Sequence, residues 1–148
     1  MHRAGLALVV MAWAGLAGGQ GNPEYTQVAN DFGAEFPYSS GSPIELRVEV
    51  LGVRFDTVAV TPQGEIVPGS PVRCEVAVDG SSVARKKAAI TFVLLLEDAQ
   101  GKTLERIGLD PFKVKSERSF SERQRRDVSG DALGSASKAY VFIHVDGP

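Results

Sequence analysis

The stretch that decides the fold is AAITFVLLLE, residues 88–97. It is too short to cross a bilayer as a helix, which takes about 20 residues, and its β-branched and aromatic residues favour a strand. Side chains along a strand point alternately to its two faces, so Phe92 and Leu94 lie on one face, and Val93 and Leu95 on the other. Because both faces are apolar, we predict a central strand, or a strand with one face against a partner.

Segments with an apolar residue at every second position predict further strands on either side, among them residues 44–50, 72–78, 112–123 and 139–145. Turn signals separate the segments at residues 61–64, 68–71, 79–82 and 98–102. A break in the alternation at Leu51–Gly52 favours a β-bulge there. About seven short strands predict an all-β fold, an antiparallel β-sandwich of the immunoglobulin or fibronectin type III class.

A hairpin signature follows the apolar strand. Its parts are a Phe-x-Leu strand, an Asp-x-x-Gly-Lys turn, a Leu-x-Pro stretch and a late Phe, here Phe92, Leu94, Asp98, Gly101, Lys102, Leu109, Pro111 and Phe120. In these features residues 85–120 resemble the FxLYD-type domains of exported prokaryotic proteins. Leu95 and Leu96 stand where that family has an aromatic residue and an aspartate. The resemblance implies a β-sandwich module and carries over no catalytic residue.

The N-terminal residues 1–19 have the three parts of a secretory signal peptide. Met1–Arg3 is basic, residues 4–17 carry no charge, and small residues end the segment at Ala17–Gly19. We predict that this segment is removed on export. The mature protein is then periplasmic or extracellular and has no transmembrane segment. We further expect a bacterial protein, because no asparagine has the Asn-x-Ser/Thr context of N-glycosylation.

Residues 20–43 form a segment of their own ahead of the predicted sandwich domain, residues 44–148. The segment is rich in aromatic residues and ends in a linker of Ser, Gly and Pro. An Asn-Pro pair is typical of a helix start, and the spacing of Tyr25, Phe32 and Phe36 predicts a short helix with one apolar face. The alternative is a flexible leader that lies on the domain.

The second apolar face of the richest strands needs a cover, because a two-layer sandwich buries only one face of each sheet. Either the N-terminal segment folds back over this face, or the face and the segment bind a partner. The predicted interaction surface consists of Tyr25, Phe32, Phe36, Val93, Leu95, Tyr140 and Phe142.

Few residues are candidates for nucleophilic or proton-transfer chemistry. After removal of the leader His144 is the remaining histidine, and we interpret it as a strand residue and not as a general base. Cys74 lies on an apolar strand face without a basic neighbour, which favours core packing over nucleophilic chemistry. The oxygen-rich residues 127–131 lack the third acid and the distal Glu of a calcium loop. We therefore predict no catalytic residue, no metal and no cofactor.

The formal net charge of the whole chain is −2, and basic residues gather in its second half. The cluster consists of Lys113, Lys115, Arg118, Arg123, Arg125 and Arg126. Such a patch could bind an anionic envelope polymer, although a solvated strand face is the simpler interpretation. No aromatic residues alternate with these bases to stack on nucleotides, so a nucleic-acid partner is not expected.

The leading hypothesis is an exported, non-enzymatic β-sandwich module. It binds a macromolecule or serves as an accessory part of a cell-envelope assembly, and its expected partner is another envelope or secreted protein. The alternative is a small-ligand carrier or an enzyme with a pocket near His144. A polar cavity at that histidine would favour the alternative, whereas a fully packed core would favour the module.

Overall fold

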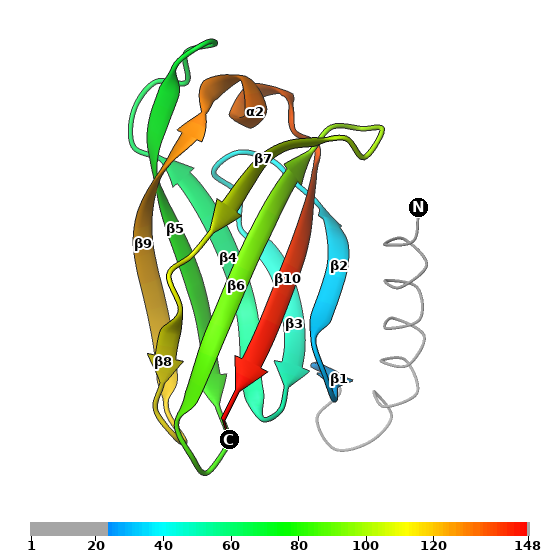
Figure 1. Cartoon of the computed structure of the whole chain (residues 1–148), viewed down its shortest axis with the longest axis vertical. Coiled ribbons are helices and arrows are strands. Elements are labelled where there is room, and N and C mark those ends of the chain that lie inside the picture. Colours follow the sequence, from blue (N-terminus) through cyan, green and yellow to red (C-terminus); the bar gives the residue numbers. More distant parts are fainter. Residues whose placement is uncertain (1–23, 148) are drawn as a thin grey trace.

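Two β-sheets pack face to face in the computed structural model, which describes residues 24–147 (Figure 1). The predicted all-β sandwich is confirmed. The predicted signal peptide, residues 1–19, lies outside the described residues. The described part has ten strands where about seven were expected. The N-terminal segment adds two of them, and the strand predicted over residues 112–123 is divided between β8 and β9.

Sheet A contains five strands in the order β1-β3-β4-β5-β9. Neighbouring strands pair antiparallel, except that β1 runs parallel to β3. The strands are β1 (Thr26–Val28), β3 (Ile44–Val50), β4 (Val53–Pro62), β5 (Pro71–Ser82) and β9 (Ser119–Ser129).

Sheet B is built around β6, the strand from which the fold was predicted. β6 pairs with β10 along one edge and with β7 and β8 along the other, and β2 pairs with the far side of β10. The predicted central position of this strand is therefore confirmed. The strands are β2 (Phe32–Pro37), β6 (Ala88–Glu97), β7 (Thr103–Gly108), β8 (Phe112–Val114) and β10 (Lys138–Asp146).

The short helix predicted in residues 20–43 is wrong, because the described part of this segment forms the strands β1 and β2. β1 adds to the edge of sheet A, and the chain then crosses to the other layer, where β2 pairs with β10. Each sheet edge offers a row of unpaired backbone groups, whereas an isolated helix of this length is marginal in water. Backbone pairing thus outweighs the helical spacing, and the segment is part of the sandwich.

The β-bulge predicted at Leu51–Gly52 is also wrong, because these residues form the tight turn between β3 and β4. Both have positive φ angles, 51° and 85°, which is the conformation of the two-residue turn that suits hairpins. The register shifts of sheet A lie elsewhere, between Glu45 and Val48 in β3 and between Phe55 and Thr57 in β4.

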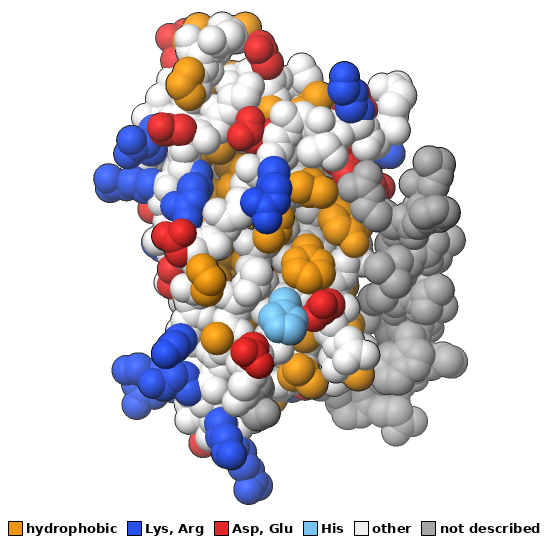
Figure 2. Space-filling view, in the orientation of Figure 1, with side chains coloured by type: hydrophobic (Ala, Val, Ile, Leu, Met, Phe, Trp, Pro, Cys, Tyr) orange, Lys and Arg blue, Asp and Glu red, His pale blue; other side chains and the backbone are white. Residues whose placement is uncertain are grey.

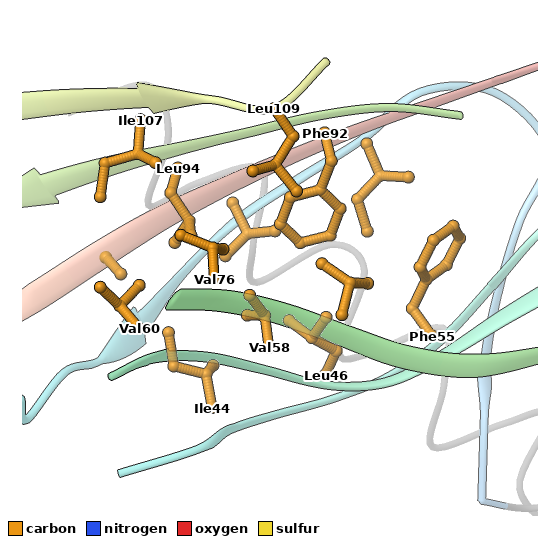
Figure 3. Close-up of a cluster of buried hydrophobic side chains, with 14 of the residues drawn as sticks. Ile44, Leu46, Phe55, Val58, Val60, Val76, Phe92, Leu94, Ile107 and Leu109 are labelled. Carbon is orange, nitrogen blue, oxygen red and sulfur yellow. The ribbon is translucent and has the colours of Figure 1, made fainter. Parts of the chain in front are cut away.

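The core fills the space between the two sheets (Figure 3). Phe55 from sheet A and Phe92 from sheet B meet there with their ring centroids 6.3 Å apart. Both side chains are fully buried. Cys74 also lies in this layer with 0% of its surface exposed, as predicted.

Residues 127–137 continue β9 as far as Ser129 and then form the short helix α2 (Gly130–Ser135). The side-chain oxygen of Ser129 accepts a hydrogen bond from the backbone N–H of Ala132. Serine is a preferred residue at this capping position, so Ser129 favours the start of the helix.

Candidate functional site

The two sheets have outer faces of opposite character. In sheet A the outward side chains of β3, β4, β5 and β9 are mostly charged; they include Glu45, Arg47, Glu49, Arg54, Arg73, Glu75, Asp79, Arg123, Arg125 and Asp127. In sheet B the outward side chains at the centre of β6 and β10 are apolar. A charged outer face is the usual one for a sheet that meets water, so the face of sheet B is the unusual one.

The apolar centre of sheet B is formed by two cross-strand pairs. Tyr140 of β10 lies opposite Leu95 of β6, and Phe142 lies opposite Val93. All four side chains are partly exposed. Figure 2 shows hydrophobic side chains gathered over β10 and its neighbours, beside the pale-blue histidine. We call Val93, Leu95, Tyr140 and Phe142 the sheet B patch.

Charged residues of opposite sign flank the sheet B patch. The row through Tyr140 and Leu95 continues to Glu35 on β2 and to Arg106 on β7. Figure 2 shows acidic and basic side chains around the apolar centre. Sequence reasoning missed these flanking residues, because strand order, which decides which edge each one occupies, depends on long-range pairing.

The three N-terminal aromatics assigned to the interaction surface lie outside the sheet B patch. Phe32 is 3% exposed and belongs to the core, and Phe36 packs against the core with its ring 6.3 Å from that of Phe32. Tyr25 lies on the other layer, beside β3 and β4. Four of the seven predicted surface residues therefore lie together, and the N-terminal segment extends the sheets edge to edge without covering the patch.

Tyr25 anchors β1 to the outer side of sheet A. Its hydroxyl donates a hydrogen bond to Oδ1 of Asp56, which raises the pKa of the phenol. The guanidinium of Arg54 lies 4.9 Å from the ring centroid, a cation–π contact. Arg54 in turn pairs with Glu49 at 2.9 Å. This aromatic residue therefore has a structural role.

His144 lies one row beyond the sheet B patch, on the same face. Its Nδ1 is 2.6 Å from Oδ1 of Asp31, the residue before β2, and both side chains are about half exposed. The hydrogen bond with Asp31 is the main reason that the pKa of His144 is raised. His144 does not line the three surface hollows found at the α2 end, around Lys115 to Arg118, and between β2 and the start of β10.

Cys74 lies in the core on sheet A, whereas His144 lies on the outer face of sheet B. The thiol lies on the inner side of β5 and contacts the carbonyl oxygen of Val72, with Sγ and O 3.6 Å apart. Burial raises the pKa of the thiol. A nucleophilic cysteine needs access and a lowered pKa, so this environment favours the predicted packing role.

The predicted basic patch does not form one surface. Lys115 and Arg118 line a hollow of about 440 Å³ together with Lys87, Ser116 and Glu117. Arg123 lies on the outer face of sheet A, where it pairs with Glu75 at 3.0 Å. An anionic polymer would therefore meet the hollow at one end of the sandwich instead of a continuous basic strip.

Arg126 closes an open side of the sandwich. It lies on β9 and points toward the segment between β7 and β8, where its Nε donates to the carbonyl oxygen of Gly108 and a guanidinium nitrogen lies 3.1 Å from Asp110. Gln124 adds two hydrogen bonds of 2.9 Å with the backbone N–H and C=O of Asp110. These contacts join the two sheets, so we assign Arg126 a structural role.

An acidic hollow of about 360 Å³ lies at the α2 end of the sandwich. Each of its carboxylates has a protein partner: Asp127 pairs with Arg73, Asp131 accepts from Gly69 N–H, and Glu105 accepts from Ser129 N–H. In residues 24–147 no group of His, Cys, Asp or Glu is arranged to hold a metal ion. The same residues contain no helix that is long and apolar enough to cross a membrane.

No protein-family model matches the chain. Among solved structures, the chain is similar to the crystal structure of a DUF1425 family member from Shewanella sp. PV-4. The two are 15% identical, with a TM-score of 0.32, and the similarity covers 76% of this chain and 95% of that chain. The β-sandwich class of the present chain rests on its own strand pairing.

Proposed function

We propose that the chain is an exported, non-enzymatic β-sandwich module that associates with another protein through the outer face of sheet B. The observation that carries the proposal is the contrast between the two outer faces, charged in sheet A and apolar at the centre of sheet B. Exposing aromatic and aliphatic side chains in one contiguous patch is unfavourable in water, so such patches are typical of interaction surfaces. Aromatic residues such as Tyr140 and Phe142 are also enriched at the centres of protein–protein interfaces.

The export part of the proposal rests on the leader sequence, and the choice of a module over an enzyme rests on the placement of the reactive side chains. Cys74 and His144 lie on different sheets, and the histidine is engaged by Asp31 on an open face. The alternative of a carrier or an enzyme would need a pocket at His144. Residues 85–120, which resemble FxLYD-type domains, add support for a role in an envelope assembly.

Site-specific photo-crosslinking in the cells that make the protein tests the proposal. A photoreactive phenylalanine analogue replaces Phe142, a change that preserves the aromatic ring. The control carries the same analogue at Thr61, an exposed outward residue of β4 in sheet A. We expect a protein adduct, identified by mass spectrometry, at position 142 and little adduct at position 61. Equal adduct yields at both positions, or none at position 142, would contradict the proposal.

A further inference from the structure

We infer that the protein surface which covers the sheet B patch is a second copy of this chain, related by a two-fold axis parallel to the strands. This inference rests on the proposed function, because it names the partner of the same face. It is carried by the distribution of charge around the patch, which brings opposite charges together under that symmetry.

The first element of the inference is the charge gradient across sheet B. The carboxylates of the face lie on its β2 and β10 side, where Lys138 and His144 of β10 also lie, and the bases Arg106 and Lys113 lie on the β7 and β8 side. On the acidic side are Glu35, Asp31 and Asp146; on the basic side are Arg106 and Lys113. The apolar patch lies between the two groups.

The second element is the effect of a two-fold axis on this gradient. An axis that runs along the strands, in the plane between two copies, places the β2 edge of one copy over the β7 edge of the other. Glu35 and Arg106 belong to one cross-strand row. Glu35 of each copy would therefore face Arg106 of the other copy across the interface. Lys113 would meet the acidic corner that Asp31 and Asp146 form in the second copy.

The alternative axis, across the strands, is disfavoured by the same residues. It would place the β2 edge of one copy over the β2 edge of the other, and Glu35 would then face Asp31. Like charges in direct opposition are costly; the same axis would place Lys138 over Asp146, so its charge contacts are mixed, whereas the axis along the strands sets Glu35 against Arg106 twice.

The third element is the apolar centre. Under the favoured axis Phe142 of one copy lies over Val93 of the other, and Tyr140 lies over Leu95, so each aromatic ring packs on an aliphatic side chain. Four strands spaced about 4.8 Å apart and nine residues long give a face of roughly 500 Å². Two such faces bury about 1,000 Å² in total, the lower limit of a specific interface. We therefore expect a reversible dimer with a dissociation constant in the micromolar range.

Sedimentation velocity over a range from low micromolar to several hundred micromolar protein tests the inference. We expect a monomer–dimer equilibrium that Phe142→Lys weakens at least tenfold and that the matched control Thr61→Lys leaves unchanged. Phe142→Lys introduces two charges at the buried centre of the dimer, whereas Thr61→Lys adds the same charge to sheet A. A dimer that Phe142→Lys does not weaken would contradict the inference.

A charge exchange keeps the test independent of any folding defect in Phe142→Lys. Glu35→Arg and Arg106→Glu should each weaken the dimer several-fold, and the double variant should restore it. Within one copy β10 and β6 separate these residues, and three strand spacings amount to about 14 Å, so restoration has to arise between copies. Failure of the double variant to restore the dimer would overturn the two-fold arrangement.

The outcomes for the two proposals are distinguishable. A protein that stays monomeric at all concentrations, but gives a crosslink from position 142 to a different protein, would overturn the second copy as the partner and leave the proposed function in place. A protein that stays monomeric and gives no such crosslink would overturn both.

Discussion

At the scale of single residues, the contact between His144 and Asp31 gives the sheet B face a pH-dependent border. The two residues are 113 positions apart in the chain, and both are exposed. A carboxylate in hydrogen-bond contact stabilises the protonated imidazole, which raises the pKa of His144 above its ordinary value of 6.5. The contact therefore joins the end of β10 to the start of β2 most strongly when the histidine is charged.

The first prediction concerns this contact. Asp31→Asn should return the pKa of His144 toward 6.5, as measured by NMR titration of the ring protons. Because the folded-state pKa is raised, the contribution of the pair to the free energy of unfolding is fully present below pH 6.5. It is lost as the pH rises through the folded-state value. The difference in melting temperature between the native protein and Asp31→Asn should shrink accordingly; a difference that grows with pH would contradict the assignment.

At the scale of elements, the anchoring of β1 depends on a few side-chain contacts, because this strand has three residues. Tyr25 supplies a hydrogen bond to Asp56 and a ring under Arg54. Asp56 lies where the pairing of β4 with β5 shifts register. The irregularity in β4 therefore coincides with the site that holds the N-terminal strand.

The second prediction is that Tyr25→Phe lowers the free energy of unfolding by about 1 kcal/mol, through loss of a partly exposed hydrogen bond to a charged group. The ring and its cation–π contact remain in this variant. The control Glu24→Gln alters an exposed pair with a distance of 4.0 Å to Arg47 and should have little effect. Chemical denaturation measures both; equal effects of the two variants would contradict the anchoring role of Tyr25.

Elements were predictable from sequence where the alternation was long. The central strand of sheet B could be predicted from residues 88–97, because a ten-residue apolar run with strand-forming residues is a strong signal. Residues 25–36 were mistaken for a helix because their apolar spacing suits both structures, and the deciding factor is pairing with β3 and β10, which are distant in the chain. The Leu51–Gly52 turn was mistaken for a bulge because both produce the same break in alternation.

The candidate site was predictable in part, for a related reason. Val93, Leu95, Tyr140 and Phe142 follow from alternation in two strands, and the pairing of those strands brings them together. The flanking residues Glu35 and Arg106 do not follow from local sequence, because their edges of the sheet depend on strand order. Likewise, the bases between residues 113 and 126 are contiguous in sequence, but β8 and β9 belong to different sheets, so the structure divides them.

At the scale of the whole molecule, the sandwich has one charged outer face and one outer face with an apolar centre, and we propose that the second face binds a partner. The charged outer face of sheet A includes compensating ion pairs, such as Arg73 with Asp127 and Arg123 with Glu75. The outer face of sheet B concentrates apolar area at its centre and charge at its edges. Our central claim is that a partner protein covers the outer face of sheet B in the cell.

Cysteine labelling tests that claim most directly. The native Cys74 is fully buried, so we expect it not to react with a polar maleimide. Phe142→Cys should react slowly in intact cells and rapidly in dilute purified protein. Thr61→Cys, on the outer face of sheet A, should react rapidly in both. Protection of position 142 alone in the cell is the result that a covered sheet B predicts. Rapid labelling of position 142 in the cell, at the rate seen for position 61, would contradict it.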